Sequence, residues 1–236
     1  MYDRSIKMYD ESHSPQDLEL ALSKGNLNKG KFLTFAHSNY YYLQMLTINN
    51  LNVGSVLEVG PGENFVANYM RSIGIKYETI DITEDQEPTI LGKLEDIDTS
   101  KYTNRYNLVC AFQMLEHSPY KEFTSNLKKM AIMSNRYVFI SLPYACYGLK
   151  FSLSFTFGQN KNFRKSFSLY LPLNKKNRRY REEYKKEFPW AVHYWEIGRK
   201  GFPLKRIKAD IESSGLRIID TFHSDNPYHY FILTEK

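Results

Sequence analysis

The fold is decided by one stretch of the sequence, Leu57-Glu58-Val59-Gly60-Pro61-Gly62-Glu63-Asn64-Phe65. It is a short apolar run that ends in a glycine-rich turn, and apolar residues at helical spacing follow it up to residue 73. A strand ending in such a turn lets a ligand approach the backbone at the edge of a sheet. Residues 76–81 predict a second strand, whose last residue, Asp81, can accept two hydrogen bonds from a ribose diol. This geometry indicates an adenosine-containing cofactor without saying which one.

Strand-like and helix-like segments alternate along the chain on both sides of this stretch. Alternation at this spacing is typical of an α/β fold, a parallel sheet with helices on both faces. The predicted strands cover residues 55–60, 76–81, 89–91, 107–112, 136–142, 216–222 and 228–234, and the predicted helices cover about 32–48, 64–73, 119–133 and 203–214, with a further helix start near Ser14.

Four regions follow from this pattern. Residues 1–54 form an N-terminal helical extension, and residues 55–142 together with 202–236 form the cofactor-binding domain. Residues 143–201 interrupt the alternation and are predicted to be a basic, aromatic insertion. Within the insertion, Phe or Leu alternates with Ser or Thr over residues 151–157 as in a half-buried strand, and we expect a lid hairpin over the acceptor pocket.

Length and composition exclude several classes of protein. The chain has 236 residues, 42% of them apolar and 25% charged, which predicts a folded chain with a sizeable core. Cys110 and Cys146 cannot build a disulfide framework, which favours a reducing compartment. No apolar run approaches the roughly 20 residues of a membrane span, and the first residues carry no apolar signal region. We therefore expect a cytoplasmic protein.

The net charge of +6 is concentrated in the insertion. Ten Lys or Arg and three acidic residues lie within 161–188, so this segment carries +7 and the rest of the chain −1. A solvated charged loop is the default interpretation. Three functional interpretations compete with it: an anionic small acceptor, an anionic membrane surface at the inner face, and, third in order, nucleic-acid phosphates.

Taken together, the motifs resemble those of the class I S-adenosylmethionine-dependent methyltransferases. Glu58, Gly60 and Gly62 match the first motif of that family, an acidic residue followed by two glycines at alternate positions, and Asn64 stands where a third glycine is common. The dinucleotide-binding pattern G-x-G-x-x-G fits less well, because Phe65 occupies its last glycine position.

Three further motifs follow in the family's order. Asp81 with Ile82 matches the second, and Leu94-Glu95-Asp96-Ile97 is similar to the acidic pair near the adenine, with Asp96 the preferred contact. The segment 108–117 is similar to the fourth-strand motif that ends in Leu-Glu-His. The resemblance implies a Rossmann-like doubly wound seven-stranded sheet, mostly parallel with a C-terminal antiparallel hairpin strand, and S-adenosyl-L-methionine as the cofactor. The cofactor-binding residues it implies are Glu58, Gly60, Gly62, Asp81, Ile82, Asp96, Ile97, Phe112 and Gln113.

Methyl transfer to oxygen needs a base but no metal in principle, and the sequence shows no convincing metal-ligand cluster. The candidate bases are His117 and His193, and Glu196 is the candidate that orients His193 or binds the substrate. The alternative, that His193 and Trp195 only pack the insertion onto the sheet, has equal weight at this point.

By analogy with related small enzymes that carry an aromatic insertion, the resemblance implies an O-methyltransferase of a polar small acceptor, such as a surface-glycan sugar or its nucleotide- or lipid-linked precursor. The amino-methylating signature, Asn or Asp followed by Pro-Pro-aromatic, is absent after the fourth strand, where Phe112-Gln113-Met114-Leu115 stands. The alternatives are an RNA or protein methyltransferase and a non-catalytic cofactor-binding regulator.

Overall fold

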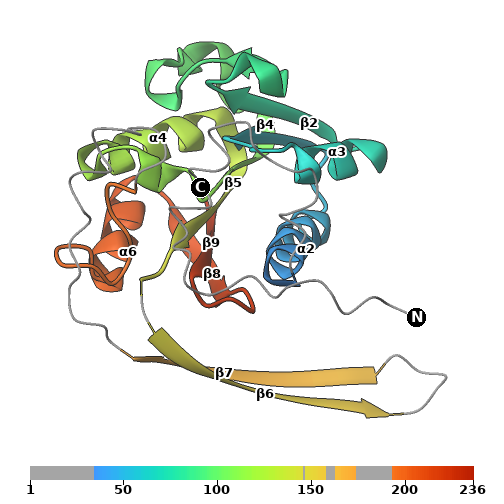
Figure 1. Cartoon of the computed structure of the whole chain (residues 1–236). Helices are drawn as coiled ribbons and strands as arrows, with labels where there is room; N and C mark the ends of the chain where they lie inside the picture. Colours follow the sequence, from blue (N-terminus) through green and yellow to red (C-terminus); the bar gives the residue numbers. More distant parts are fainter. Residues whose placement is uncertain (1–34, 146, 158–162, 174–192) are drawn as a thin grey trace.

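A seven-stranded sheet with the strand order β3-β2-β1-β4-β5-β9-β8 forms the centre of the molecule (Figure 1). The computed structural model describes residues 35–145, 147–157, 163–173 and 193–236. Its sheet consists of β1 (Ser55–Val59), β2 (Lys76–Asp81), β3 (Ile90–Leu91), β4 (Tyr106–Phe112), β5 (Ser134–Pro143), β8 (Arg217–His223) and β9 (His229–Glu235). Its helices are α2 (Phe35–Asn50), α3 (Phe65–Ser72), α4 (Phe123–Met133) and α6 (Leu204–Ser213), with short 3-10 turns at Glu84–Gln86, Leu94–Asp96, Thr99–Tyr102, Leu115–His117 and Tyr120–Glu122.

Strand direction confirms the predicted fold class. The strands β1 to β5 pair in parallel, and only β9 runs against its neighbours β5 and β8. The parallel arrangement brings the carboxyl ends of β1, β2 and β4 to one edge of the sheet, which is where ligands bind in open α/β sheets. The sheet is thus the doubly wound, mostly parallel type with a C-terminal antiparallel strand.

Each face of the sheet has its own hydrophobic core. Leu57, Val59 and Val109 pack with α4 and α6, whereas their sequence neighbours Val56 and Leu108 pack with α2 and α3. Successive strand residues point to opposite faces, so continuous apolar strands can bury both. Figure 1 shows the two helix pairs on opposite sides of the sheet.

Element boundaries agree with the prediction to within about two residues. The second predicted helix, 32–48, is described from residue 35 and continues to 50, its first predicted residues lying outside the described ranges, and the strand β5 begins at Ser134. The predicted helix at 119–133 is divided into a 3-10 turn and α4, and the predicted helix near Ser14 lies outside the described residues.

The described part of the insertion contains a long two-stranded ribbon, β6 (Tyr147–Phe157) paired antiparallel with β7 (Phe163–Leu173). The sequence predicted a hairpin here but did not locate its second strand. The ribbon follows β5 almost directly, and the described chain resumes at His193. In Figure 1 the ribbon lies beyond the α/β body, below the ends of β5 and β8. No helix in the described ranges is long and apolar enough to cross a bilayer.

Candidate functional site

The glycine-rich turn after β1 has a backbone that only glycine adopts without strain. Gly60 has φ +70°, its N–H donates to the Ile80 carbonyl at 2.8 Å, and a Cβ built on it would lie 2.6 Å from Met114 Cγ. Gly62 also has a positive φ, +57°, but faces open space, since a Cβ built on it would have no heavy atom within 4 Å. Asn64, at the third-glycine position of the motif, has φ 58° as well, a conformation that Asn tolerates better than most residues. The turn therefore keeps the backbone accessible to a ligand.

Asp81 and Ile82 lie beside this turn, at the carboxyl end of β2. The Asp81 Oδ1 accepts the Thr83 N–H at 2.8 Å, which fixes the carboxylate at the edge of the sheet. Ile82 is 57% exposed, unusual for a large apolar side chain next to a sheet edge. A carboxylate and an uncovered apolar surface in adjacent positions suit a ribose and the flat face of a base, respectively.

The acidic pair divides into one residue that the protein holds and one that faces solvent. The Glu95 Oε1 accepts hydrogen bonds from Ser118 Oγ at 2.5 Å and Asn126 Nδ2 at 3.0 Å, whereas Asp96, the residue preferred from the sequence, is exposed. Burial by itself would raise the Glu95 pKa, but the hydrogen bonds from Ser118 and Asn126 outweigh it and hold the pKa below its usual range. Glu95 is thereby ionised and fixed to the fourth-strand loop, and Asp96 stays a predicted cofactor contact.

Lys129 of α4 fixes the turn that contains the acidic pair, residues 94–97. Its Nζ donates to the carbonyls of Leu94 and Ile97, each at 3.2 Å, and to the Glu95 carbonyl. Sequence reasoning missed this residue, because one lysine on a helix gives no signal of three backbone partners. Ile97 is held partly exposed at the end of this loop.

Glu58 lies beneath the turn and not in it. It is 3% exposed, and its Oε2 accepts the Tyr77 O–H at 2.9 Å. Burial raises the pKa of this carboxyl to about 7, although the Tyr77 hydrogen bond opposes the shift. The structure therefore places the first residue of the motif in the support of the turn, out of direct reach of solvent.

Phe112, the last residue of β4, and Gln113, which follows it, have different surroundings. Phe112 is buried and packs edge-on against Phe139, so its side chain belongs to the core. Gln113 has φ 52°, and its Nε2 donates to Ser141 Oγ at 3.3 Å. The same Ser141 hydroxyl pairs with the Tyr40 hydroxyl of α2 at 3.2 Å, so α2 reaches the end of the sheet. Of the three tyrosines 40–42, the structure packs Tyr40 into the core and leaves Tyr42 55% exposed.

A buried polar cluster lies at the carboxyl ends of β4 and β5. Its members are Glu116, His117, His193, Glu196 and Tyr228. His193 is 2% exposed, and its Nδ1 lies 3.0 Å from Glu196 Oε1. That oxygen also accepts the Tyr228 O–H at 3.0 Å, and the other Glu196 oxygen accepts from Arg199 Nε at 2.9 Å. Glu196 is therefore held by the Tyr228 O–H and by Arg199, with His193 Nδ1 at hydrogen-bond distance from the same carboxylate.

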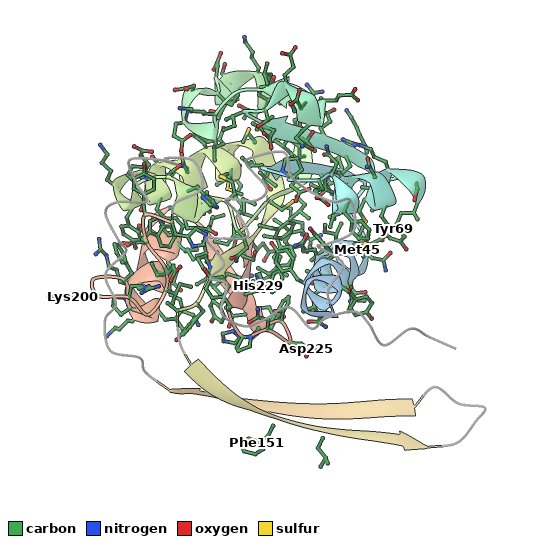
Figure 2. All side chains as sticks on the ribbon, in the orientation of Figure 1. Met45, Tyr69, Phe151, Lys200, Asp225 and His229 are labelled. Carbon is green, nitrogen blue, oxygen red and sulfur yellow. The ribbon has the colours of Figure 1, made fainter. Side chains whose placement is uncertain are left out.

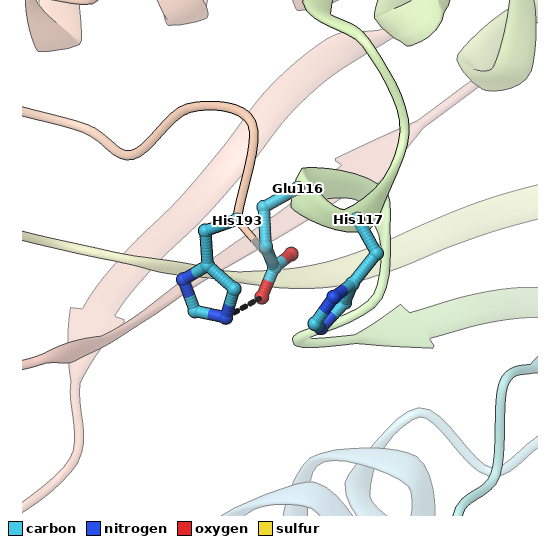
Figure 3. Close-up of side chains that lie close together, drawn as sticks. All are labelled: Glu116, His117 and His193. Carbon is cyan, nitrogen blue, oxygen red and sulfur yellow. Dashed lines mark ion pairs between the residues drawn. The ribbon is translucent and has the colours of Figure 1, made fainter. Parts of the chain in front are cut away.

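The second nitrogen of His193 points the other way, to Glu116. Its Nε2 is 3.9 Å from Glu116 Oε1, and Glu116 is fully buried (Figure 3). The His117 ring stands edge-on to the His193 ring, with centroids 4.9 Å apart. One ligand atom each from Glu116, His117 and His193 lies within 4.8 Å of the others, so this set could hold a metal ion. No such set was expected from the sequence.

Two backbone contacts connect the distant segments that build the cluster. The Tyr194 N–H donates to the Glu116 carbonyl at 2.8 Å, and Trp195 Nε1 donates to the Ser118 carbonyl at 3.1 Å. Trp195 is fully buried, and Tyr120 and Phe123 pack around it. Trp195 therefore packs the segment onto the body, and His193 lies in the polar cluster, where its role as a base stays a prediction.

Comparison with known proteins gives a family. A family model described as a methyltransferase domain matches residues 35–220. The chain is similar in structure to 1,6-didemethyltoxoflavin-N1-methyltransferase of Burkholderia thailandensis, with a TM-score of 0.55 and 12% identity over 94% of this chain and 86% of that one. No curated protein matches the sequence.

Two further structures show the same fold. Magnesium protoporphyrin IX methyltransferase of Synechocystis PCC 6803 has a TM-score of 0.54 at 12% identity, covering 97% of this chain and 100% of that chain. A protein described as an O-methyltransferase of Nostoc punctiforme PCC 73102 has a TM-score of 0.54 at 13% identity, covering 94% and 70%. The acceptors in these names differ, so the fold does not choose among them.

Proposed function

Because the chain belongs to the methyltransferase-domain family, we propose that it uses S-adenosyl-L-methionine to methylate an oxygen of a polar small acceptor. A sugar of a surface glycan, or its nucleotide- or lipid-linked precursor, is the acceptor class we favour. The observation that carries the proposal is the pairing of His193 with Glu196, buried at the carboxyl end of the sheet. Oxygen acceptors need a base at this place, and a sulfonium donor already supplies an activated methyl group.

The residues of the turn fit the proposed donor. Gly62 faces open space, where a side chain would otherwise occupy the approach to the backbone, and Asp81 is fixed beside it as a diol acceptor. Ile82 adds an exposed apolar surface for a base. We define Gly60, Gly62, Asp81 and Ile82 as the donor site. Two structural neighbours were crystallised with S-adenosylmethionine or S-adenosylhomocysteine, which supports the same ligand here.

His193 has the geometry of a general base. In the tautomer whose Nδ1–H donates to Glu196 Oε1, Nε2 is the nitrogen that would take the proton. As the acceptor O–H loses its proton to Nε2, the oxygen forms a bond to the methyl carbon and the carbon–sulfur bond breaks, with its electron pair passing to sulfur. The imidazolium that forms lies against the Glu196 carboxylate, and it returns the proton to water after product release.

Met114 connects the two halves of the site. Its side chain packs against Gly60, and Glu116 follows it two residues later, in the 3-10 turn Leu115–His117. The cluster that contains His193 is therefore next to the turn that would hold the donor. This proximity supports in-line transfer between an acceptor held at the cluster and a donor held over the turn.

The test is methyl transfer from isotopically labelled S-adenosylmethionine to a panel of acceptors. The panel contains nucleotide-linked sugars, lipid-linked sugars, a mixed RNA and a protein extract. We expect label on a sugar oxygen, and no label with His193→Ala. Label on RNA or on protein nitrogen would overturn the acceptor class, and donor binding without transfer to any acceptor would favour a cofactor-binding regulator.

The ligand set of Glu116, His117 and His193 allows one specific alternative, in which a divalent cation holds the acceptor oxygen and His193 is a ligand. Chelation separates the two mechanisms. If His193 is the base, transfer should survive extensive dialysis against EDTA. Activity lost on chelation and restored by Zn²⁺ or Mn²⁺ would make His193 a metal ligand in place of a base.

A further inference from the structure

The register of the β6–β7 ribbon divides its residues into two unlike faces. Residues directly opposite in an antiparallel pair share a face, and alternate residues along each strand do too. One face carries positions 147, 149, 151, 153, 155 and 157 of β6 and 163, 165, 167, 169, 171 and 173 of β7. The sequence places Tyr, Leu or Phe at all of these positions except Lys165. The opposite face carries four Ser, with Gly148, Lys150, Thr156, Arg164, Tyr170 and Pro172.

The apolar face is exposed where the structure describes it. Phe151 is 60% exposed and Leu153 is 57% exposed. Figure 2 shows the Phe151 side chain on the side of the ribbon that faces away from the α/β body. A two-stranded ribbon is marginally stable alone, and an apolar face of this length is seldom left in water. The direction of Phe151 means that the body itself does not cover this face.

The charge of the ribbon favours an anionic bilayer over a second copy of the chain as the partner of the apolar face. Neither strand contains an acidic residue, and Lys150, Arg164 and Lys165 lie within the ribbon. Seven more Lys or Arg, against three Glu, occur in the next stretch of sequence, 174–188. A second copy seated on this face would bring a ribbon that also contains cations and no acidic residue. An anionic bilayer offers an apolar layer and a negative surface together.

The backbone of the ribbon limits how it can meet a bilayer. Its two outer edges carry unpaired N–H and C=O groups, which cannot enter the hydrocarbon layer. Eleven residues per strand give a length of about 35 Å, enough to lie flat along a surface. A ribbon in the interfacial layer buries its apolar side chains and keeps both edges near water and lipid headgroups.

We propose that the β6–β7 ribbon docks the protein, apolar face down, on a bilayer that contains anionic phospholipid. The ribbon begins directly after β5 and the described chain resumes at His193, so docking would place the buried polar cluster next to the membrane. A lipid-linked acceptor, one of the classes favoured above, would then reach the cluster from the bilayer. The docking itself does not depend on the reaction.

Vesicle flotation of the full-length protein tests the proposal. We expect binding to vesicles with one part phosphatidylglycerol to two parts phosphatidylcholine to exceed binding to pure phosphatidylcholine by about tenfold or more, and to weaken as salt is raised. The double variant Phe151→Ser/Leu153→Ser should lose about tenfold or more of this binding. The matched control, Ile132→Ser/Ile219→Ser, removes two exposed apolar side chains outside the ribbon and should stay near wild type.

Two outcomes would overturn the proposal. In one, wild-type protein binds anionic vesicles no better than the double variant does. In the other, the wild type is a dimer by light scattering that the double variant converts to monomer, which would assign the face to a second copy. Affinity for S-adenosylhomocysteine confirms that the double variant is folded, because the ribbon is remote from the donor site. His193→Ala should bind vesicles like wild type, so that failure of docking and failure of the catalytic assignment are distinguishable.

Discussion

At the carboxyl ends of β1 and β2 the proposed donor site combines a glycine turn with the side chains of Asp81 and Ile82, whereas at the ends of β4 and β5 the buried polar cluster is made by ionisable side chains. Gly60 and Gly62 shape the first by their positive φ and by the space they leave open. His193 and Glu196 shape the second by a hydrogen bond inside the protein. The comparison indicates that a donor site can be built on an open turn, whereas acceptor chemistry needs side chains whose hydrogen bonds position a proton-accepting group.

The largest expected effect is on the rate of methyl transfer, and it distinguishes the buried polar cluster from the donor site. His193→Ala should reduce methyl transfer by about a thousandfold, the contribution typical of a positioned base, while affinity for S-adenosylhomocysteine stays within about twofold. Transfer rate and calorimetry measure the two quantities. Partial rescue of the rate by added imidazole would support the role of base, and an unchanged rate would contradict it.

The next effect perturbs the donor site alone. Gly60→Ala should weaken donor binding by about tenfold or more, because its Cβ would lie 2.6 Å from Met114 Cγ and the backbone has φ +70°. Gly74→Ala is the matched control, since Gly74 has φ +91° but no heavy atom within 4 Å. Both variants carry backbone strain of about 1 kcal/mol, so stability should fall in both and donor affinity only in the first. Equal affinities would contradict the assignment.

A third prediction concerns Glu58, which supports the turn from below. Its pKa in the folded protein is about 7, above the ordinary value of 4.5, so the folded state holds this proton more tightly than the unfolded state. The stability it contributes is full below pH 4.5 and is lost as pH rises through 7, a decline of about 3 kcal/mol.

Denaturant unfolding between pH 4.5 and 8 checks this. The free energy of unfolding of wild type should fall relative to that of Glu58→Gln over the window, because the Gln side chain cannot ionise. Parallel curves for the two proteins would show that Glu58 has an ordinary pKa.

The smallest effect tests how the buried polar cluster is held together. Tyr228→Phe removes the O–H that Glu196 Oε1 accepts at 3.0 Å, and it should lower kcat by about tenfold with KM unchanged. The pH profile of kcat should move as well, which loss of packing alone would not cause. Tyr137→Phe, at the far end of β5, is the control and should leave both unchanged.

The sequence named residues of both regions, but it indicated a local arrangement only for the glycine turn, while His117, His193 and Glu196 were named one by one. A glycine turn and a strand-end Asp are local signals, so Gly60, Gly62 and Asp81 could be located without the structure. The cluster depends on a contact between segments distant in sequence, such as the bond from Trp195 to the Ser118 carbonyl. No local pattern predicts that contact.

The acidic pair shows the same limit. Sequence position favoured Asp96 as the contact, but it gave no sign that Ser118 and Asn126 hold Glu95, because both lie in segments distant from the pair. Likewise, the alternation in residues 151–157 predicted a strand with one apolar face, and only the register with β7 showed that the face continues across a second strand.

The most direct test of a donor site separate from the buried polar cluster is calorimetry with S-adenosylhomocysteine on three proteins, wild type, Asp81→Ala and His193→Ala. We predict that wild type and His193→Ala bind with the same affinity, and that Asp81→Ala binds about tenfold or more weakly after losing the carboxylate that accepts from the ribose. The absence of binding to wild type, or equal weakening by both substitutions, would contradict this separation.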